Sequence, residues 1–290
     1  DAVRGRVHAR VDGRPAGIVR CSGAADVATA FDFARAHDLE VALRGGGHNP
    51  AGHCVVDDGL VIDLSLLRAV HVDPAARIAR AGGGSTWRDF DSATLGAALV
   101  TPGGVVGSTG VCGLTLGGGI GHLTSQHGLT CDNLVGGELV TPDGGVVRVS
   151  ATEPETSELL WGLRGGGGNF GVATWLEFRL HPLPRIVGGL LVYRGEGIRD
   201  ALRVFRDVVA RSPRELSCQV TLRTDESGAP MLVVAPCYTG ASDHPEELEL
   251  LRAAPGLVED GVREHGFADQ QVVFGDTYGV ERNYWKGHFV

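Results

Sequence analysis

The sequence predicts an α+β fold made of two domains, at residues 1–183 and 184–290. The chain has 290 residues, enough for about two domains of roughly 100–200 residues each. Strand and helix patterns follow one another as far as Pro182 and Pro184, and these prolines mark the expected boundary. Beyond them, strands and amphipathic helices indicate part of an antiparallel sheet covered by helices.

Apolar spacing and turn residues define the elements expected in the first domain. Strands are expected at 15–20, 40–43, 60–64, 77–81 and 172–180, with a hairpin at 135–140 and 146–149, whereas 98–100 is only short and apolar. Helices are expected at 24–38 and 152–163. Thr86, with Asp89 three residues later, is a capping signal for a helix that reaches about Leu95. Residues 101–121 are mostly glycine, serine, threonine and small apolar residues.

The second domain is expected to alternate strands with helices. Strands are expected at 187–193, 216–223 and 231–238, the last two around a turn at 225–228, and helices at 198–211 and near 245–253.

Composition excludes several classes of protein. The 26 basic and 35 acidic residues give a net charge of −9, which argues against a nucleic-acid backbone as the main partner. No pair among the six cysteines has the C-x-x-C spacing of a zinc or thioredoxin-like site, so no metal is expected. No signal peptide or long apolar run is present, so we expect a cytoplasmic, non-membrane protein. Secretion stays open because the sequence begins at Asp1 rather than Met.

Glycine is the outlier of the composition, at 45 residues. It clusters at 45–47, 82–84, 103–104, 117–119 and 165–168, between expected strands and helices. Glycine allows the main chain to approach a ligand closely, so the clusters favour a large ligand cradled by backbone. Tight turns in a strand-rich fold are the alternative.

The familiar nucleotide motifs do not explain these clusters. Residues 166–171 read GGGNFG and formally match G-x-G-x-x-G, but a helix precedes them and a strand follows. The dinucleotide fingerprint needs the reverse order, so that a helix N-terminus meets the pyrophosphate. The Walker sequence G-x-x-x-x-G-K-[ST] does not occur.

Two loops carry the candidate chemistry. Arg44, three glycines and His48 follow directly after a strand, where successive backbone N–H groups can form an anion-binding nest. Arg44 could add charge there or could support the loop. The second loop spans 107–123, in which Ser108 and Thr109 can donate hydrogen bonds. Cys112 there could react as a thiolate, or could be a small buried hydrophobe.

Four motifs together resemble one family. They are RGGGH at 44–48, GSTGVCGLTLGGGIGHL at 107–123, GLTCDNL at 128–134 and WGLRGGGGNFGV at 161–172. They are similar to the FAD-linked oxidases of the vanillyl-alcohol oxidase type, in the berberine-bridge-enzyme-like branch. The resemblance covers residues 15–183 closely and implies a PCMH-type FAD-binding domain followed by a partial substrate domain.

The resemblance assigns residues to the cofactor. It implies that His48 bonds to the flavin 8α-methyl and that Cys112 bonds to flavin C6, which makes FAD bicovalent. Asp132 and Asn133 fall near the nucleotide, although Asn133 could simply order its loop. The full set of cofactor residues implied is Arg44, Gly45, Gly46, Gly47, His48, Ser108, Thr109, Gly110, Val111, Cys112, Gly113, Gly117, Gly118, Gly119, Gly121, Leu123, Asp132, Asn133, Asn169 and Val172.

The resemblance also implies a reaction. Hydride would pass from an alcohol carbon of a sugar, glycoside or polycyclic substrate to flavin N5, and O2 would reoxidise the flavin to give H2O2. A dehydrogenase with poor oxygen reactivity and a non-catalytic flavin-binding fragment are the alternatives.

The catalytic base is not assigned to any residue of this chain. Family members continue past Val290, and their C-terminal part often supplies a tyrosine base, so we expect the base there, in a further segment or a second chain. We expect Tyr193, Tyr238, Tyr278 and Tyr284 to be packed residues instead.

Overall fold

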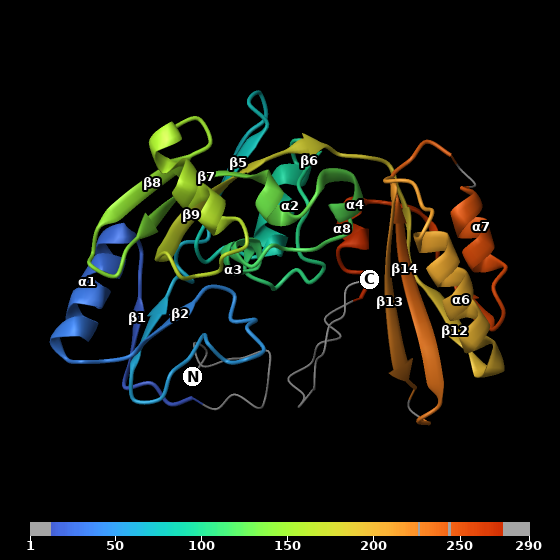
Figure 1. Ribbon diagram of the computed structural model, residues 1–290, viewed down its shortest axis with the longest axis horizontal. Helices are drawn as coiled ribbons and strands as arrows, with labels where there is room; N and C mark the ends of the chain where they lie inside the picture. The colour runs from blue at the N-terminus through green and yellow to red at the C-terminus, as the bar shows by residue number, and fades with distance from the viewer. Residues whose placement is uncertain (1–12, 226, 243–244, 275–290) are drawn as a thin grey trace. The chain divides into compact units, whose positions relative to one another are not determined.

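The computed structural model describes residues 13–225, 227–242 and 245–274 (Figure 1). These residues form two compact units, one made of 13–120 and 129–182, the other of 121–128 and 183–274. The main division lies between Pro182 and Leu183. Segment 121–128 joins the second unit because side chains from that unit bind it. Arg214 Nε donates to the Ser125 carbonyl at 3.3 Å, and Thr239 Oγ1 donates to Gln126 Oε1 at 3.1 Å.

A parallel three-stranded sheet begins the first unit. Its order is β1 (Gly17–Arg20), β3 (Leu60–Asp63) and β2 (Val41–Arg44). Helix α1 (Ala24–Ala36) links β1 to β2 and buries Val27, Ala30 and Ala34 in one cluster with Ile62. Every residue of β3 is buried, as expected for the middle strand of a parallel sheet. The C-terminal ends of β2 and β3 therefore lie side by side, at Arg44 and Asp63.

A five-stranded antiparallel sheet completes the first unit. Its order is β4 (Val70–Asp73), β5 (Ile78–Gly82), β9 (Val172–Arg179), β7 (Leu134–Val140) and β8 (Val146–Ser150). A two-stranded ladder joins β6 (Leu99–Val100) and β10 (His181–Pro182). The helical segments are α2 (Trp87–Leu95), α3 (Val111–Leu116), η2 (Thr130–Asn133), η3 (Pro154–Thr156) and α5 (Ser157–Leu163).

Aromatic packing forms the centre of this unit. Trp87 and Phe90 of α2 and Phe178 of β9 are all fully buried, with ring centroids 5.3–6.5 Å apart in edge-on contacts. Helix α2 begins at the expected cap, because Asp89 N donates to Thr86 Oγ1 while Thr86 N donates to Asp89 Oδ2.

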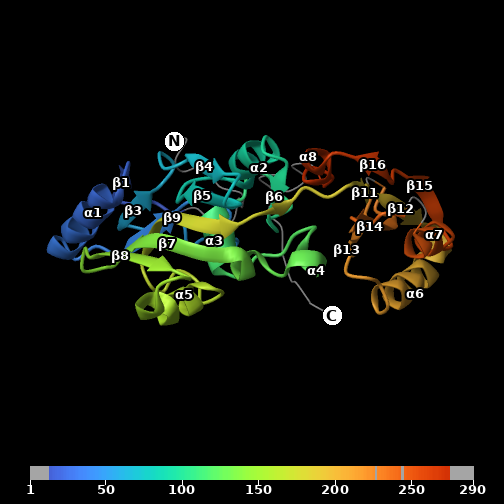
Figure 2. The same ribbon diagram turned by 90° about the horizontal axis from the view of Figure 1, so that it is seen from above.

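The second unit is an antiparallel sheet with helices on one face. Strands run in the order β15 (Leu257–Asp260), β12 (Leu191–Arg194), β14 (Pro230–Tyr238), β11 (Ile186–Gly188) and β16 (Arg263–His265), and β13 (Leu216–Thr224) pairs with β14. Helices α6 (Ile198–Val209) and α7 (Glu246–Arg252) lie beside each other against this sheet (Figures 1 and 2). The remaining helical segments are α4 (Thr124–His127), η4 (Gly195–Gly197) and α8 (Phe267–Gln270).

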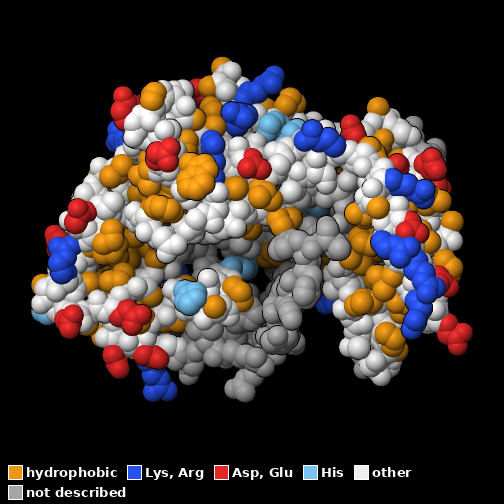
Figure 3. Space-filling view, viewed as in Figure 1, with side chains coloured by type: hydrophobic (Ala, Val, Ile, Leu, Met, Phe, Trp, Pro, Cys, Tyr) orange, Lys and Arg blue, Asp and Glu red, His pale blue; other side chains and the backbone are white. Residues whose placement is uncertain are grey.

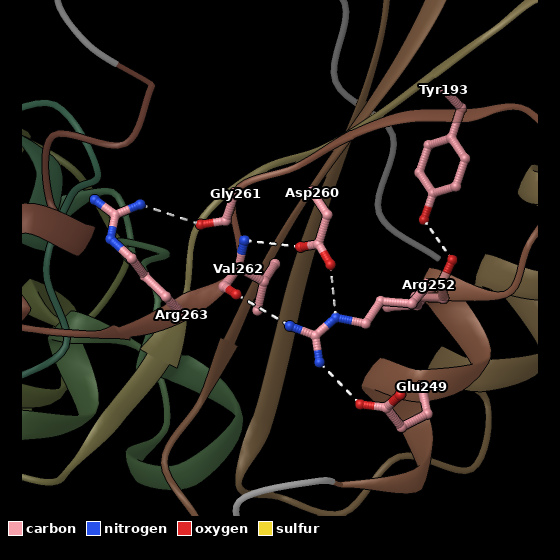
Figure 4. A network of polar contacts seen from close by, with 8 residues as sticks. Tyr193, Glu249, Arg252, Asp260, Gly261, Val262 and Arg263 are labelled. Carbon is pink, nitrogen blue, oxygen red and sulfur yellow. Dashed lines mark hydrogen bonds and ion pairs between the residues drawn. The ribbon is translucent and has the colours of Figure 1, made fainter.

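One arginine ties helix α7 to the turn between β15 and β16 (Figure 4). Arg252 donates to Glu249 Oε1 at 2.8 Å, Asp260 Oδ2 at 2.8 Å and the Val262 carbonyl at 3.0 Å. In the same region the buried Tyr193 hydroxyl donates to the Leu251 carbonyl at 2.8 Å. The helix and the sheet edge are thus joined by polar contacts as well as by apolar packing.

The outer side of α6 carries arginines, and Figure 3 shows cationic side chains over the helical side of this unit. Arg199, Arg203 and Arg206 are exposed, and two of them pair with the exposed residues Asp200 and Asp207. Because these pairs are exposed, they contribute little to stability.

The α+β expectation is confirmed, and three local expectations are corrected. The strand expected at 187–193 is two strands, because Gly189 between them takes a φ of +138° and turns the chain. The stretch 101–121, for which no element was expected, contains α3, and β4 was not expected either. Tyr278 and Tyr284 lie outside the described residues.

Among the described residues, no helix is long and apolar enough to cross a membrane. Within the same part of the chain, no three His, Cys, Asp or Glu side chains are grouped so as to hold a metal ion.

Candidate functional site

The loop that follows β2 carries the three glycines and His48. Gly47 has a φ of +73°, a conformation that glycine adopts without steric cost. Gly46 lies against the second glycine-rich loop, since a Cβ added to it would come within 2.3 Å of the Gly110 nitrogen. The main chains of two loops that are far apart in the sequence therefore touch here, and only glycine permits this approach.

An ion pair supports the glycine loop from the ends of the parallel strands. Arg44 Nη1 lies 3.6 Å from Oδ2 of the fully buried Asp63, whose Oδ1 accepts from the Ser65 backbone at 2.7 Å. The Arg44 guanidinium also packs beside Gly47, at 3.2 Å from where a Cβ there would lie. This placement favours the supporting role for Arg44 over that of a cation directed at a ligand.

The imidazole of His48 contacts two hydroxyl groups from the second loop. Nε2 lies 2.9 Å from Ser108 Oγ, and Nδ1 lies 3.4 Å from Thr109 Oγ1. The histidine is only partly buried. The second loop thus holds the His48 side chain in one orientation.

A cavity of about 510 Å³ opens beside His48. Nine of the expected cofactor residues line it: Gly45, Gly46, Gly47, His48, Thr109, Gly110, Cys112, Gly113 and Gly117. They come from the β2 loop, from the second loop and from α3. The structure therefore brings together segments that lie more than 60 residues apart, and the volume is in the range of about 300–1,000 Å³ typical of ligand sites.

The walls of the cavity fit a long, partly aromatic ligand with a charged centre such as FAD. At Gly113 and Gly168, both lining residues, an added Cβ would meet nothing within 4 Å, so bare main chain faces the open space. Apolar side chains complete the wall, among them Leu43, Leu64 and Ala173. Backbone N–H groups at the glycines can bind a pyrophosphate, and the apolar wall can pack against a ring.

Comparison with known proteins identifies the family. The family model described as "FAD binding domain" matches residues 15–150. (R)-6-hydroxynicotine oxidase of Paenarthrobacter nicotinovorans is 37% identical over 255 residues, which are 86% of this chain and 55% of that protein. The chain belongs to the FAD-linked oxidoreductases that carry this FAD-binding domain.

Solved structures of related proteins show the same fold. The crystal structure of 6-hydroxy-D-nicotine oxidase from Arthrobacter nicotinovorans superposes with a TM-score of 0.89 at 33% identity, over 95% of this chain and 61% of that one. BBE-like 1 of Physcomitrella patens gives 0.83 at 24% identity, over 94% of this chain and 59% of that one, a likeness of fold alone. The chain therefore spans just over half the length of these relatives.

Cys112 lines the cavity of this FAD-binding domain, but its buried thiol does not ionise readily. It lies in α3 with 5% of its surface exposed, and burial raises the pKa of its thiol to about 12. Its Sγ lies 3.9 Å from the Gly82 carbonyl. At neutral pH the side chain is a protonated thiol, whereas bond formation to a flavin ring requires a thiolate.

Several expected cofactor residues hold loops in place without lining the cavity. Asp132 accepts from the Leu129 backbone at 2.8 Å, and Asn133 Nδ2 donates to the Leu129 carbonyl at 3.0 Å. Asn169 Nδ2 donates to the Gly166 carbonyl at 2.8 Å. The suggestion that Asn133 orders its loop agrees with these contacts.

The other expected residues divide between the two units. Val111 and Val172 are buried in the core of the first unit, which also contains Gly118 and Gly119. Gly121 and Leu123 belong to the second unit with His122, whose Nδ1 lies 3.4 Å from Gln270 Nε2. Burial lowers the pKa of this histidine to about 4. Arg44 and Ser108 act on the glycine loop and on His48, as described above.

Sequence reasoning missed some lining residues. Asn49, Pro50, His53 and Cys54 follow His48 within six residues, and that proximity could have indicated them. Gly83, Gly167 and Gly168 lie in glycine clusters that the sequence showed, but none was assigned to the ligand. Leu43, Leu64, Leu114, Leu116 and Ala173 carry only the signal of a buried residue, which does not distinguish a cavity wall from a core.

The two tyrosines that the structure describes, Tyr193 and Tyr238, are packed residues of the second unit. The Tyr193 hydroxyl is buried and bonded to a backbone carbonyl, and burial raises its pKa. Tyr238 lies in the apolar core of the second unit.

Proposed function

We propose that this chain is the flavin-binding part of an FAD-dependent oxidase. Its substrate is an alcohol of a sugar, a glycoside or a polycyclic metabolite, and O2 is the electron acceptor that leaves as H2O2. The observation that carries the proposal is His48, held by two hydroxyl groups at the edge of a cavity whose wall is glycine main chain.

The residues divide the work of holding the cofactor. His48 would bond to the flavin 8α-carbon, and the N–H groups of Gly45, Gly46 and Gly47 would bind its pyrophosphate. Leu64 and Ala173 in the cavity wall would exclude water from the ring. When bound, FAD supplies the redox chemistry by accepting a hydride from the substrate carbon.

The test is whether flavin stays with the denatured protein. The chain is produced with FAD, precipitated in acid, and examined by absorbance and intact mass. We expect one flavin per chain to remain attached in the native sequence, and the combined changes His48→Ala and Cys112→Ala to release it completely. Non-covalent FAD in the native sequence would refute the histidyl bond. No FAD binding at all would refute the proposal.

Attachment through Cys112 as well is the finer form of this proposal. It requires a thiolate at a buried position that raises the thiol pKa, so we expect the histidyl bond to form first. Flavin that leaves only when His48→Ala and Cys112→Ala are combined would establish both bonds. Full release from His48→Ala alone would refute the cysteinyl bond.

An amine substrate is the second candidate, favoured by the 37% identity to a protein named (R)-6-hydroxynicotine oxidase. A panel of sugars, glycosides, polycyclic alcohols and cyclic amines distinguishes the two through the rate of flavin bleaching without oxygen. H2O2 measured under air then separates an oxidase from a dehydrogenase. A flavin that none of the panel reduces would favour a non-catalytic flavin-binding fragment.

A further inference from the structure

We propose that His122, Gln270 and His265 form a pH-sensitive switch that holds residues 121–128 on the second unit at neutral pH and releases them in acid. The neutral imidazole of His122 accepts a hydrogen bond from Gln270, and protonation of the ring breaks this contact. The inference goes beyond the proposed function, because it needs neither FAD nor a bond at His48.

Gln270 is the centre of this cluster of side chains. It lies in α8, and its side chain is fully buried. Its Oε1 lies 2.8 Å from His265 Nε2, and its Nε2 lies 3.4 Å both from the Pro236 carbonyl and from His122 Nδ1. One amide group thus joins α8 to β16, to β14 and to residues 121–128.

The Pro236 carbonyl decides which way this amide points. A carbonyl oxygen only accepts hydrogen bonds, so the NH2 group of Gln270 faces Pro236 and its oxygen faces His265. His265 Nε2 therefore carries a proton, which it donates to Gln270. The other N–H of the NH2 group is left for His122 Nδ1, which accepts it. Neutral His122 consequently carries its own proton on Nε2.

The surroundings of His122 favour the neutral form of its ring. The residue is 2% exposed, and its Nε2 has no hydrogen-bond partner within the part of the chain that the structure describes. Burial lowers the pKa of the imidazole to about 4, contact with the Gln270 main chain opposes this in part, and nearby His265 adds to it. Protonation would place an N–H at Nδ1, opposite the Gln270 NH2 group, and two donors cannot bond to each other.

The elements around the ring supply no carboxylate that offsets a charge on it, as far as residues 13–225, 227–242 and 245–274 are concerned. Strand β14 contains no charged residue. Asp269 of α8 is exposed, and Glu264 of β16 pairs with Arg185 at 2.7 Å. The Phe274 ring lies parallel to the imidazole at 6.3 Å. A protonated His122 would therefore be a buried cation without a counter-ion, which destabilises the closed arrangement.

The remaining polar contacts of residues 121–128 lie nearer the surface. Arg214 donates to the Ser125 and Gln126 carbonyls at 3.3 and 3.5 Å, and Thr239 Oγ1 donates to Gln126 Oε1 at 3.1 Å. His122 is the buried end of the attachment. Loss of its contact should therefore let the segment open locally while the sheet of the second unit stays folded.

The direction of the pH dependence follows from the two states of His122. In the open state the ring meets water, where the pKa of a histidine is about 6.5. In the closed state the pKa is about 4. The closed state is therefore fully favoured above pH 6.5 and loses stability as the pH falls towards 4. One proton taken up on opening lowers the closed-to-open ratio by up to about tenfold per pH unit.

The first test is an NMR titration of the histidine rings in the full chain. We expect native His122 to carry its proton on Nε2 at neutral pH and to be still uncharged at about pH 5.5. Gln270→Glu places a carboxylate beside Nδ1 and should raise the titration midpoint by about one pH unit or more. His122→Gln identifies the signals. A proton on Nδ1, or a native midpoint at the ordinary histidine value, would overturn the proposal.

The second test measures hydrogen exchange of residues 121–128 between neutral pH and about pH 5, corrected for the intrinsic rate. Protection in the native chain should fall by up to about tenfold per pH unit. His122→Phe keeps a ring that cannot titrate, so its protection should start lower and should lose this pH dependence. His127→Gln is the matched control on the same segment, because burial and Arg214 lower the pKa of His127 independently of this cluster. An equal fall in the native chain and in His122→Phe would show that His122 is not the switch.

Discussion

Glycines of the cavity act in two opposite ways at the scale of single residues. Gly46 is needed because backbone of another loop occupies the space of its side chain, 2.3 Å from a would-be Cβ. Gly113 faces open space inside the cavity and costs its helix stability. Gly46 thus allows two loops to pack closely, whereas Gly113 leaves space in the cavity.

Gly113→Ala should separate stability from cofactor binding. We expect the free energy of unfolding to rise by about 0.5–1 kcal/mol, because alanine is the better residue in a helix interior. We expect weaker FAD binding, because the methyl group enters the cavity. Thermal denaturation without FAD and fluorescence titration with FAD measure the two effects. Gly46→Ala, the comparison, should lower stability, and tighter FAD binding in Gly113→Ala would contradict the placement of this cavity.

Arg44→Met should destabilise the first unit by about 3–5 kcal/mol, because it leaves the buried Asp63 carboxylate without its cation. Chemical denaturation measures the loss. Arg203→Met, which removes an exposed pair with Asp200, should change stability by less than about 0.5 kcal/mol. Adding Asp63→Asn to Arg44→Met should recover part of the loss. Equal losses of stability in Arg44→Met and Arg203→Met would show that the buried pair contributes no more to stability than the exposed pair.

His48 shows which residue-level features the sequence could reveal. The triple glycine indicated its loop and the family motif predicted a role for it, and both are local patterns. The hydroxyl contacts of Ser108 and Thr109 with its ring depend on tertiary approach across 60 and 61 residues. The burial that raises the pKa of the Cys112 thiol also depends on tertiary structure, because a cysteine in a glycine-rich stretch gives no sign of its exposure.

At the scale of elements, local signals predicted helices and hairpins well. The Thr86–Asp89 capping box and the turn before β8 need only neighbouring residues, and both occur where expected. The division between β11 and β12 depends on contacts with residues far away in the sequence. The break at Gly189 is one example, since its Cβ would meet the Gly261 carbonyl at 2.3 Å. Strand β4 is different, because it pairs only with the neighbouring strand β5 and was still not expected.

Arg252→Met should destabilise the second unit by about 1–2 kcal/mol, because three acceptors lose their donor while the apolar stem is kept. Hydrogen exchange should locate the effect in α7 and in the turn between β15 and β16. Arg206→Met is the control, since its partner Asp207 is exposed. Faster exchange spread evenly over both units would contradict a local role for this network.

At the scale of the whole molecule, buried thiols should make stability sensitive to alkali. Burial raises the pKa of Cys21 from 9.0 to about 11, and those of Cys112, Cys218 and Cys237 from 9.0 to about 12. Above pH 9 the unfolded chain releases thiol protons that the folded chain keeps. The free energy of unfolding should therefore fall between pH 9 and 11, by at most about 1.4 kcal/mol per pH unit for each thiol.

The slope of stability against pH is the quantity to measure for this prediction. Urea denaturation at a series of pH values gives it. Cys237→Ala should lower stability at pH 7 by leaving a cavity, and should also make the alkaline slope shallower by one proton. An unchanged slope in that variant would show that Cys237 ionises equally in both states.

Segment 121–128 has a practical consequence for dividing the protein. The chain leaves the first unit after Ile120 and re-enters it at Leu129, so the two units are interleaved along the sequence. A gene cut at codon 183 would produce a flavin-binding half whose Ser125 carbonyl and Gln126 side chain have lost Arg214 and Thr239. It would also produce a second half that lacks helix α4. If the halves are expressed separately, or if one is exchanged with that of a relative, residues 121–128 must therefore be kept in the same polypeptide as the second unit.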